Sequence, residues 1–184
     1  MINYYISYNK AYRHFIDFEF SAETNGVKSM CLQLPSWRPG RYELANYAQN
    51  IQEWEALDQN EEKLDFKKIT KDLWEVQTEG ADKIIIRYNY YANQLDAGAS
   101  YLDSNQLYIN PVNCFFYVVG REQEEYTINF HLAEDYEKMP ISMRKKWPKA
   151  AYGRERYLAR EFMKHKKAEQ KLRESIRNII KRVV

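Results

Sequence analysis

Histidine is the side chain best suited to metal binding or proton transfer, and this sequence contains only three of them. His14, His131 and His165 are far apart, and none has a second histidine within four residues. A structural zinc site needs four ligands that come together in space. We therefore expect three ordinary, hydrogen-bonded histidines, and we predict no catalytic, cofactor-binding or metal-binding residue in this chain.

Other side chains that could carry chemistry lack the spacing that the chemistry requires. The six glycines are scattered, so they form neither a phosphate-binding loop nor a dinucleotide-binding turn. No serine lies in the Gly-x-Ser-x-Gly turn that exposes a nucleophile. Carboxylates are dense in 122–135, and we interpret them as a solvated face, because spacing along the chain alone does not place two carboxylates across a substrate.

The two cysteines, Cys31 and Cys114, both lie in apolar runs of the sequence. We expect two buried free thiols, because unpaired cysteine is among the residues most often found inside proteins. A disulfide between them stays open as an alternative, since it requires their strands to be neighbours.

The apolar segments of the sequence bear on where in the cell the protein is located. No apolar run approaches the roughly 18 residues of a membrane-spanning helix. The first ten residues, MINYYISYNK, are too polar for a signal peptide. We therefore expect a cytoplasmic protein without a membrane span.

The segments that must position all these residues have the sequence pattern of β-strands. Aromatic residues make up 15% of the chain, and they pack well on the pleated surface of a sheet. Apolar and polar residues alternate with a period of two, which predicts an antiparallel β-sandwich. The expected strands are 12–20, 29–34, 51–57, 64–69, 73–77, 82–92, 113–120 and 125–132.

Three details of this fold prediction can be checked separately. In 12–20, alternation places Tyr12 and His14 on the same face as the apolar residues that follow them. The run 113–120 is apolar throughout and predicts a strand buried on both faces. A short helical turn is expected at 43–49, and the loop 92–106 is expected to cross between the sheets.

The net charge of +2 hides two segments of opposite character. Residues 1–142 contain 13 Lys and Arg against 22 Asp and Glu, a net charge of −9. Residues 143–184 contain 15 against 4, a net charge of +11. We predict a β-sandwich accessory domain over 1–142 and a basic helical tail over 143–184.

The tail has neither glycine nor proline after Gly153, and its apolar residues recur mostly every three or four positions, the pattern of an amphipathic helix. Three interpretations stay open. The helix could dock its apolar stripe on the sandwich or on a second copy, or the abrupt change of composition could come from a frameshift or a junction. The third, a contact with nucleic acid or an anionic membrane, is the one we favour least, because no nucleic-acid-binding motif accompanies the charge.

One short motif stands out before the expected helical turn. In LPSWRPGRYELANYAQNI, proline fixes its own backbone angle and glycine permits a turn that a side chain would block. The tryptophan can anchor that turn by burying apolar surface worth about 2–3 kcal/mol. We predict a structural turn that also offers a contact to a neighbouring domain, formed by Trp37, Pro39, Gly40 and Tyr42.

This stretch resembles the N-terminal domain of the glycyl aminopeptidases, zinc metallopeptidases with a PDZ domain near the C-terminus. That domain carries a Trp-x-Pro-Gly-x-Tyr turn and then an aromatic-Ala-x-Asn-Ile stretch. A second block, 90–120, and the segment 71–78 resemble the same domain, so the resemblance covers about residues 2–140. Arg41 departs from the family, which often has a small residue there. The matching positions are Trp37, Pro39, Gly40, Tyr42, Tyr47, Ala48, Asn50 and Ile51.

The resemblance implies an accessory domain without catalysis of its own. In that family the activity resides in a helical domain with a His-Glu-x-x-His motif, whose histidines hold zinc while the glutamate acts as base. None of the histidines here begins such a motif. We therefore expect a truncated or frameshifted product that would pack against the missing catalytic domain, with zinc only in that domain.

A hypothesis of a different class is a free-standing binding module. Tyr88, Tyr90 and Tyr91 could form a platform for a sugar or peptide, and the basic tail could contact nucleic acid. Aromatic residues at strand spacing more often pack in cores and cross-strand pairs, so we favour the accessory domain. An exposed apolar patch on the sandwich would also allow a homo-oligomer.

Overall fold

The computed structural model describes residues 1–38, 43–96 and 98–131. The predicted basic helix and the predicted boundary after residue 142 lie outside the described residues. So do three residues of the turn motif, Pro39, Gly40 and Tyr42, and the third histidine, His165.

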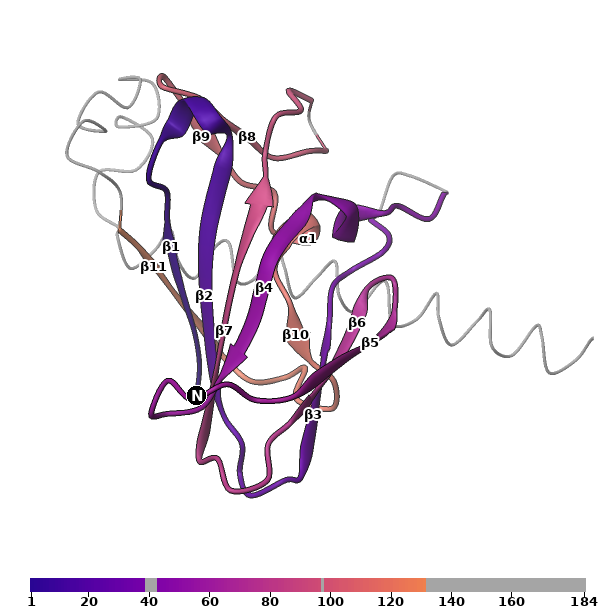
Figure 1. Cartoon of the computed structure of the whole chain (residues 1–184). Helices are drawn as coiled ribbons and strands as arrows, with labels where there is room; N and C mark the ends of the chain where they lie inside the picture. The colour runs from indigo at the N-terminus through magenta and orange to yellow at the C-terminus, as the bar shows by residue number, and fades with distance from the viewer. Residues whose placement is uncertain (39–42, 97, 132–184) are drawn as a thin grey trace, which may run out of the picture.

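The described chain is mainly β, as the sequence predicts, and it forms two larger sheets and one small sheet (Figure 1). The five-stranded sheet is, in spatial order, β11 (Tyr126–Phe130), β1 (Ile2–Ser7), β2 (Phe15–Glu23), β7 (Lys83–Tyr91) and β4 (Ile51–Leu57). The four-stranded sheet is β10 (Tyr117–Val118), β3 (Ser29–Gln33), β6 (Leu73–Gln77) and β5 (Phe66–Thr70). The small sheet pairs β8 (Tyr101–Leu102) with β9 (Leu107–Tyr108).

The helical elements among the described residues are all short. They are η1 (Ala11–Arg13), η2 (Tyr47–Asn50) and α1 (Pro111–Cys114). The turn expected over 43–49 is therefore η2, which begins and ends later than predicted. No helix in the described part of the chain is long and apolar enough to cross a membrane.

The two larger sheets share one core. Alternate residues of β1, β2 and β7 point into it from the first sheet, and Met30, Leu32 and Val76 point into it from the second. Trp54 of β4 stacks on Trp74 of β6 with ring centroids 5.8 Å apart. Burial of this apolar surface provides the main driving force for bringing the sheets together.

One pair of strands contradicts the prediction of a wholly antiparallel fold. β1 pairs with β2 in antiparallel fashion and with β11 in parallel fashion. No strand was predicted for β1, although Ile2, Tyr4 and Ile6 alternate and are fully buried. Because β11 reaches β1 only after the chain has passed through the second sheet, the direction of this pairing is not encoded locally.

Two local predictions are also wrong. The run 113–120 was expected to be one strand, but it begins inside α1 and contains only the two-residue strand β10. The cause is Asn110, whose side chain accepts a hydrogen bond from Val112 N and caps α1, with Pro111 in the first helical position. Tyr12 is 65% exposed rather than inward-facing. His14 adopts a left-handed backbone angle, φ 61°, which ends η1 before β2 begins.

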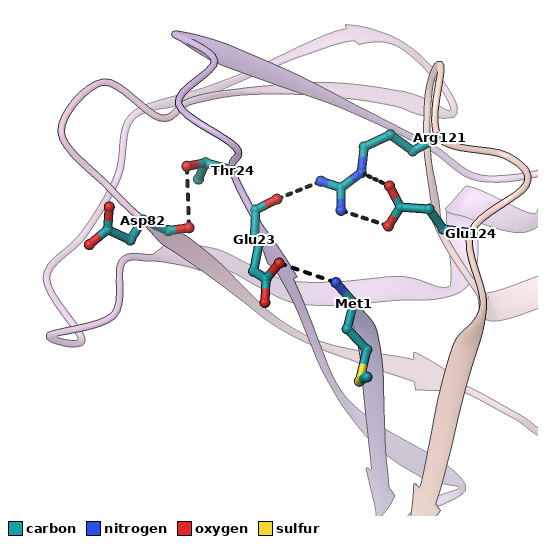
Figure 2. Close-up of polar contacts among 6 residues, drawn as sticks. All are labelled: Met1, Glu23, Thr24, Asp82, Arg121 and Glu124. Carbon is teal, nitrogen blue, oxygen red and sulfur yellow. Dashed lines mark hydrogen bonds and ion pairs between the residues drawn. The ribbon is translucent and has the colours of Figure 1, made fainter.

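An arginine and the amino terminus join one end of the molecule together (Figure 2). Arg121 donates two hydrogen bonds to the Glu124 carboxylate, at 2.6 and 2.8 Å, and a third to the Glu23 carbonyl. The Met1 ammonium lies 3.3 Å from the Glu23 carboxylate. Thr24, the next residue, hydrogen-bonds the carbonyl of Asp82. These contacts join the segment between β10 and β11 to the end of β2.

Candidate functional site

A polar hollow of about 180 Å³ lies where three separate parts of the chain meet. Arg38 and residues between Glu43 and Asn50 form one wall, and Tyr90, Tyr91, Gln94, Asp96 and residues 98–100 form another. Asn113 of α1 contributes from a third direction, and α1 contacts η2 directly (Figure 1). The hollow thus joins the two stretches, 34–51 and 90–120, on which the family resemblance rests.

The loop that carries the turn motif is closed by its own backbone. Ala45 N donates to the Ser36 carbonyl at 2.7 Å, so the chain enters and leaves the loop at one place. Leu34 N is held by the Asp72 carbonyl, and Lys71 Nζ donates to the Ala45 carbonyl at 2.9 Å. The end of β3 and the β5–β6 turn therefore fix both ends of this loop.

The Arg38 guanidinium group packs directly against Gly98. A methyl group in place of the glycine hydrogen would come within 2.1 Å of an Arg38 guanidinium nitrogen, so a larger residue would displace the end of the Arg38 side chain. The Gly98 carbonyl accepts hydrogen bonds from Asn113 Nδ2 at 3.0 Å and from Asn110 Nδ2 at 3.2 Å. The two asparagines of the α1 region thus hold the loop on which Arg38 rests.

Two polar atoms of this arrangement are buried without a hydrogen-bond partner. They are Oδ1 of Asn113 and Nε of Arg38. Asn113 is only 1% exposed, and the chain satisfies its Nδ2 but not its oxygen. Most buried polar groups in proteins are satisfied, so these two atoms are exceptions.

Tyr90 contributes a neutral hydroxyl to the hollow. Its oxygen accepts a hydrogen bond from Asn50 Nδ2 at 3.0 Å. Burial, and secondarily the nearby Cys114, raise the pKa of the Tyr90 phenol. The hydroxyl therefore keeps its proton near neutral pH and can donate it, and no acceptor for that proton is found among the described residues.

Of the predicted motif residues, only Trp37 falls within the described chain. It is half-buried and immediately precedes Arg38. Farther along the motif, Tyr47 and Asn50 line the hollow, Ala48 is buried in the core, and Ile51 begins β4. Sequence reasoning missed Arg38 and Asn113. The available signal for Asn113 was a single polar residue inside an apolar run.

The histidines and cysteines of the described chain do not gather into a site. His14 Nδ1 lies 2.5 Å from the Leu102 carbonyl, and His131 N donates to the Ile6 carbonyl. Both cysteines are free thiols, as predicted, although only Cys114 is fully buried and Cys31 is half-buried. Among the described residues, no group of three or more histidines, cysteines or carboxylates could hold a metal ion.

Of the three tyrosines proposed as a binding platform, Tyr90 and Tyr91 line the hollow and Tyr88 does not. Tyr88 and Tyr90 are core residues, and the Tyr88 hydroxyl donates to the Cys114 carbonyl at 2.6 Å. Tyr91 points to the opposite face of β7. The three residues therefore do not form one continuous flat platform, although two of them reach the same hollow.

Comparison with known proteins places the fold in one family. The family model described as the peptidase M61 N-terminal domain matches residues 3–165. This range includes the first part of the basic segment. The structure is similar to the crystal structure of an aminopeptidase N family protein from Idiomarina loihiensis, with a TM-score of 0.68 and 24% identity. The similarity covers 73% of this chain and 22% of that protein, so the chain corresponds to about a fifth of its length. No curated protein matches the chain. Because the family match extends over most of the sequence, the chain belongs to the peptidase M61 family, of which it carries the N-terminal domain.

Proposed function

We propose that this chain is a non-catalytic N-terminal domain that packs against and supports a catalytic domain of the peptidase M61 type. The observation that carries the proposal is the family match over residues 3–165. The similar crystal structure supports it, because this fold occupies about a fifth of a much longer protein there.

The assignment of chemistry to another domain follows from the side chains in the sequence. A zinc peptidase needs a metal with an open coordination position and a base beside it. The His-Glu-x-x-His arrangement that supplies both is not present in this sequence. Zinc would accordingly belong to the catalytic domain, and this domain would contribute a rigid surface.

Two exposed leucines beside the hollow offer apolar surface for a contact with another polypeptide. Leu44, between the lining residues Glu43 and Ala45, is 66% exposed, and Leu95, between Gln94 and Asp96, is 71% exposed. Single exposed leucines are common on protein surfaces, but these two lie on segments that line the same hollow. We therefore propose that the catalytic domain contacts this domain at these two segments.

The test of the non-catalytic assignment is a peptidase assay on the purified chain supplemented with zinc. We expect no release of glycine from a glycyl dipeptide and no tight binding of one zinc per chain. Zinc-dependent release that a chelator abolishes would contradict the proposal.

A further inference from the structure

A second, broader hollow lies on the outer face of the five-stranded sheet, the face directed away from the core. We propose that this outer hollow binds the basic segment 144–149 of the same chain, with the cations of that segment against Glu53 and Glu55 of β4. Segment 144–149, with the sequence RKKWPK, lies outside the described residues. The contact lies within one chain and does not depend on the proposed function.

The outer hollow has a volume of about 810 Å³ and crosses four neighbouring strands. It is lined from β1, β2, β7 and β4, which lie in this order in the sheet (Figure 1). The register of these strands places their outward-facing residues in two rows. One row is Tyr5, Glu19, Arg87 and Glu55, and the other is Ser7, Asp17, Asn89 and Gln52. The outer hollow therefore has a polar floor that runs across most of the sheet.

The charge of the outer hollow is the first argument. Its lining contains more carboxylates than cations, namely Asp17, Glu19, Glu53 and Glu55 against Lys63 and Arg87. Arg87 is already engaged, because it donates to Glu19 at 2.9 Å and to Glu61 at 2.8 Å. Among the residues that the structure describes, none forms an ion pair with Glu53 or Glu55. Partial burial raises the pKa of Asp17, so we assign the contact to these two glutamates.

The backbone of β4 is the second argument. The register of β4 against β7 shifts between Gln52 and Glu55, where three steps along β4 oppose two steps along β7. Glu53, inside this bulge, has a left-handed backbone angle, φ 52°, which is uncommon for a residue other than glycine. Its carboxylate lies on the outer face, where it accepts a hydrogen bond from Asn89 Nδ2 at 2.9 Å. The bulge thus adds a second glutamate to the same side of the outer hollow.

The place where the described chain ends is the third argument. His131 N donates to the Ile6 carbonyl, and Ser7, the next residue of β1, lines the outer hollow. From β1 to β4 the distance is about 15 Å, because neighbouring strands lie about 4.8 Å apart. Arg144 follows His131 by 13 positions, and an extended chain of that length spans up to about 45 Å. Segment 144–149 can therefore reach Glu53 and Glu55.

The composition of the segment is the fourth argument. Residues 144–149 contain four cations and no carboxylate, whereas the later cations of the chain alternate with four glutamates. A cationic run is attracted to a face with unpaired carboxylates. Because both partners belong to one chain, their binding is intramolecular and needs only a modest affinity. The family match ends at residue 165 and so includes this segment.

The test is zero-length cross-linking of the full chain with a water-soluble carbodiimide, followed by peptide mass spectrometry. The reagent activates a carboxylate, and a lysine amine in contact with it displaces the activating group and forms an amide. We expect cross-links from the three lysines of the segment to Glu53 or Glu55. They should be at least about fivefold more abundant than those to the exposed Asp82 and Glu125, and about 0.5 M salt should remove this excess. In a mixture of isotope-labelled and unlabelled chains, the cross-links should form within one chain.

Charge reversal locates the contact on both partners. Glu53→Lys combined with Glu55→Lys should abolish the excess, and the matched control, Asp82→Lys combined with Glu125→Lys, should leave it unchanged. Lys145→Glu combined with Lys146→Glu should weaken it at least about threefold. Joining the reversals on the sheet and on the segment should restore cross-linking, with the amines now on the sheet. The segment variant changes no residue of the described fold, so it decides the question even if the sheet variant does not fold.

Any of three results would contradict this assignment. They are cross-links to Glu53 and Glu55 no more abundant than those to Asp82 and Glu125, cross-links formed mainly between labelled and unlabelled chains, and an excess that neither reversal changes. The second result would instead give the outer hollow to the basic segment of a second copy. The peptidase assay that tests the proposed function is unaffected by all three, because it measures catalysis.

Discussion

At the scale of single residues, Arg121 is a polar side chain that connects separate parts of the fold. It is only 16% exposed on the side chain, it makes a bidentate pair with Glu124, and it also binds the Glu23 carbonyl (Figure 2). Charge-assisted, bidentate hydrogen bonds of this kind are stronger than ordinary surface ion pairs. Arg121 therefore stabilises the approach of β11 to β1 and β2.

Replacing Arg121 with alanine should lower the free energy of unfolding by about 1–3 kcal/mol, because the Glu23 carbonyl and Glu124 both lose their donor. Urea unfolding of the purified chain measures this. The matched control is Lys28→Ala, since the Lys28–Glu79 pair is exposed and should contribute less than about 1 kcal/mol. Equal effects of the two substitutions would contradict the role of Arg121.

Asp17 illustrates the opposite electrostatic situation. Partial burial, and secondarily the neighbouring Glu53, raise the pKa of the Asp17 carboxyl. A carboxyl whose pKa is raised by folding favours the folded state at low pH and loses that contribution as pH rises through the raised value. At neutral pH the ionised group is therefore unfavourable.

Asp17→Asn should accordingly raise the urea midpoint at pH 7 and change it little at pH 3. The control is Asp58→Asn. The Asp58 carboxylate accepts hydrogen bonds from Asn60 N and Glu62 N, so this substitution should lower the urea midpoint at pH 7. A lower midpoint for Asp17→Asn at pH 7 would show that the carboxylate is favourable where it lies.

At the scale of elements, one tyrosine connects the two larger sheets by hydrogen bonds. The hydroxyl of Tyr4, in β1, accepts from Phe116 N at 2.7 Å and donates to the Phe116 carbonyl at 3.0 Å. Phe116 lies just before β10, so the backbone of the second sheet is satisfied by a side chain of the first.

Tyr4→Phe should destabilise the chain by about 1–3 kcal/mol, because it leaves a buried N–H and a buried carbonyl without partners. Its matched control is Tyr5→Phe in the same strand, where the side chain is 50% exposed and the loss should stay within about 0.5 kcal/mol. Thermal unfolding followed by circular dichroism distinguishes the two. A Tyr4→Phe variant as stable as Tyr5→Phe would show that the Tyr4 hydrogen bonds to Phe116 do not stabilise the fold.

The elements that the sequence predicts well are those whose pattern is local. The bounds of β4 and β6 agree with the predicted 51–57 and 73–77, and the alternation of β7 places Ile84, Ile86 and Tyr88 inside. The predictions fail where distant partners decide. β1 finds its parallel partner only through β11, and the apolar run after Asn110 begins in a capped helical turn.

At the scale of the whole molecule, the candidate site depends on contacts that no single segment contains. The turn motif indicated the right stretch, since Tyr47 and Asn50 line the hollow. The contact of Arg38 with Gly98, and the support from Asn113, join residues far apart in the chain. Periodicity and spacing describe neighbours in sequence, so they cannot show which loops meet.

The proposed docking of this domain on a peptidase M61 catalytic domain involves the loops that carry Leu44 and Leu95. The most direct measurement is isothermal titration of the chain with a separately produced catalytic domain of that family. We predict saturable binding that Leu44→Glu combined with Leu95→Glu weakens at least about tenfold, since each glutamate would bury an unpaired charge in the contact. Phe66→Glu, at an exposed apolar residue of β5, should leave the binding unchanged. Absence of binding, or binding that the double substitution does not affect, would contradict the claim.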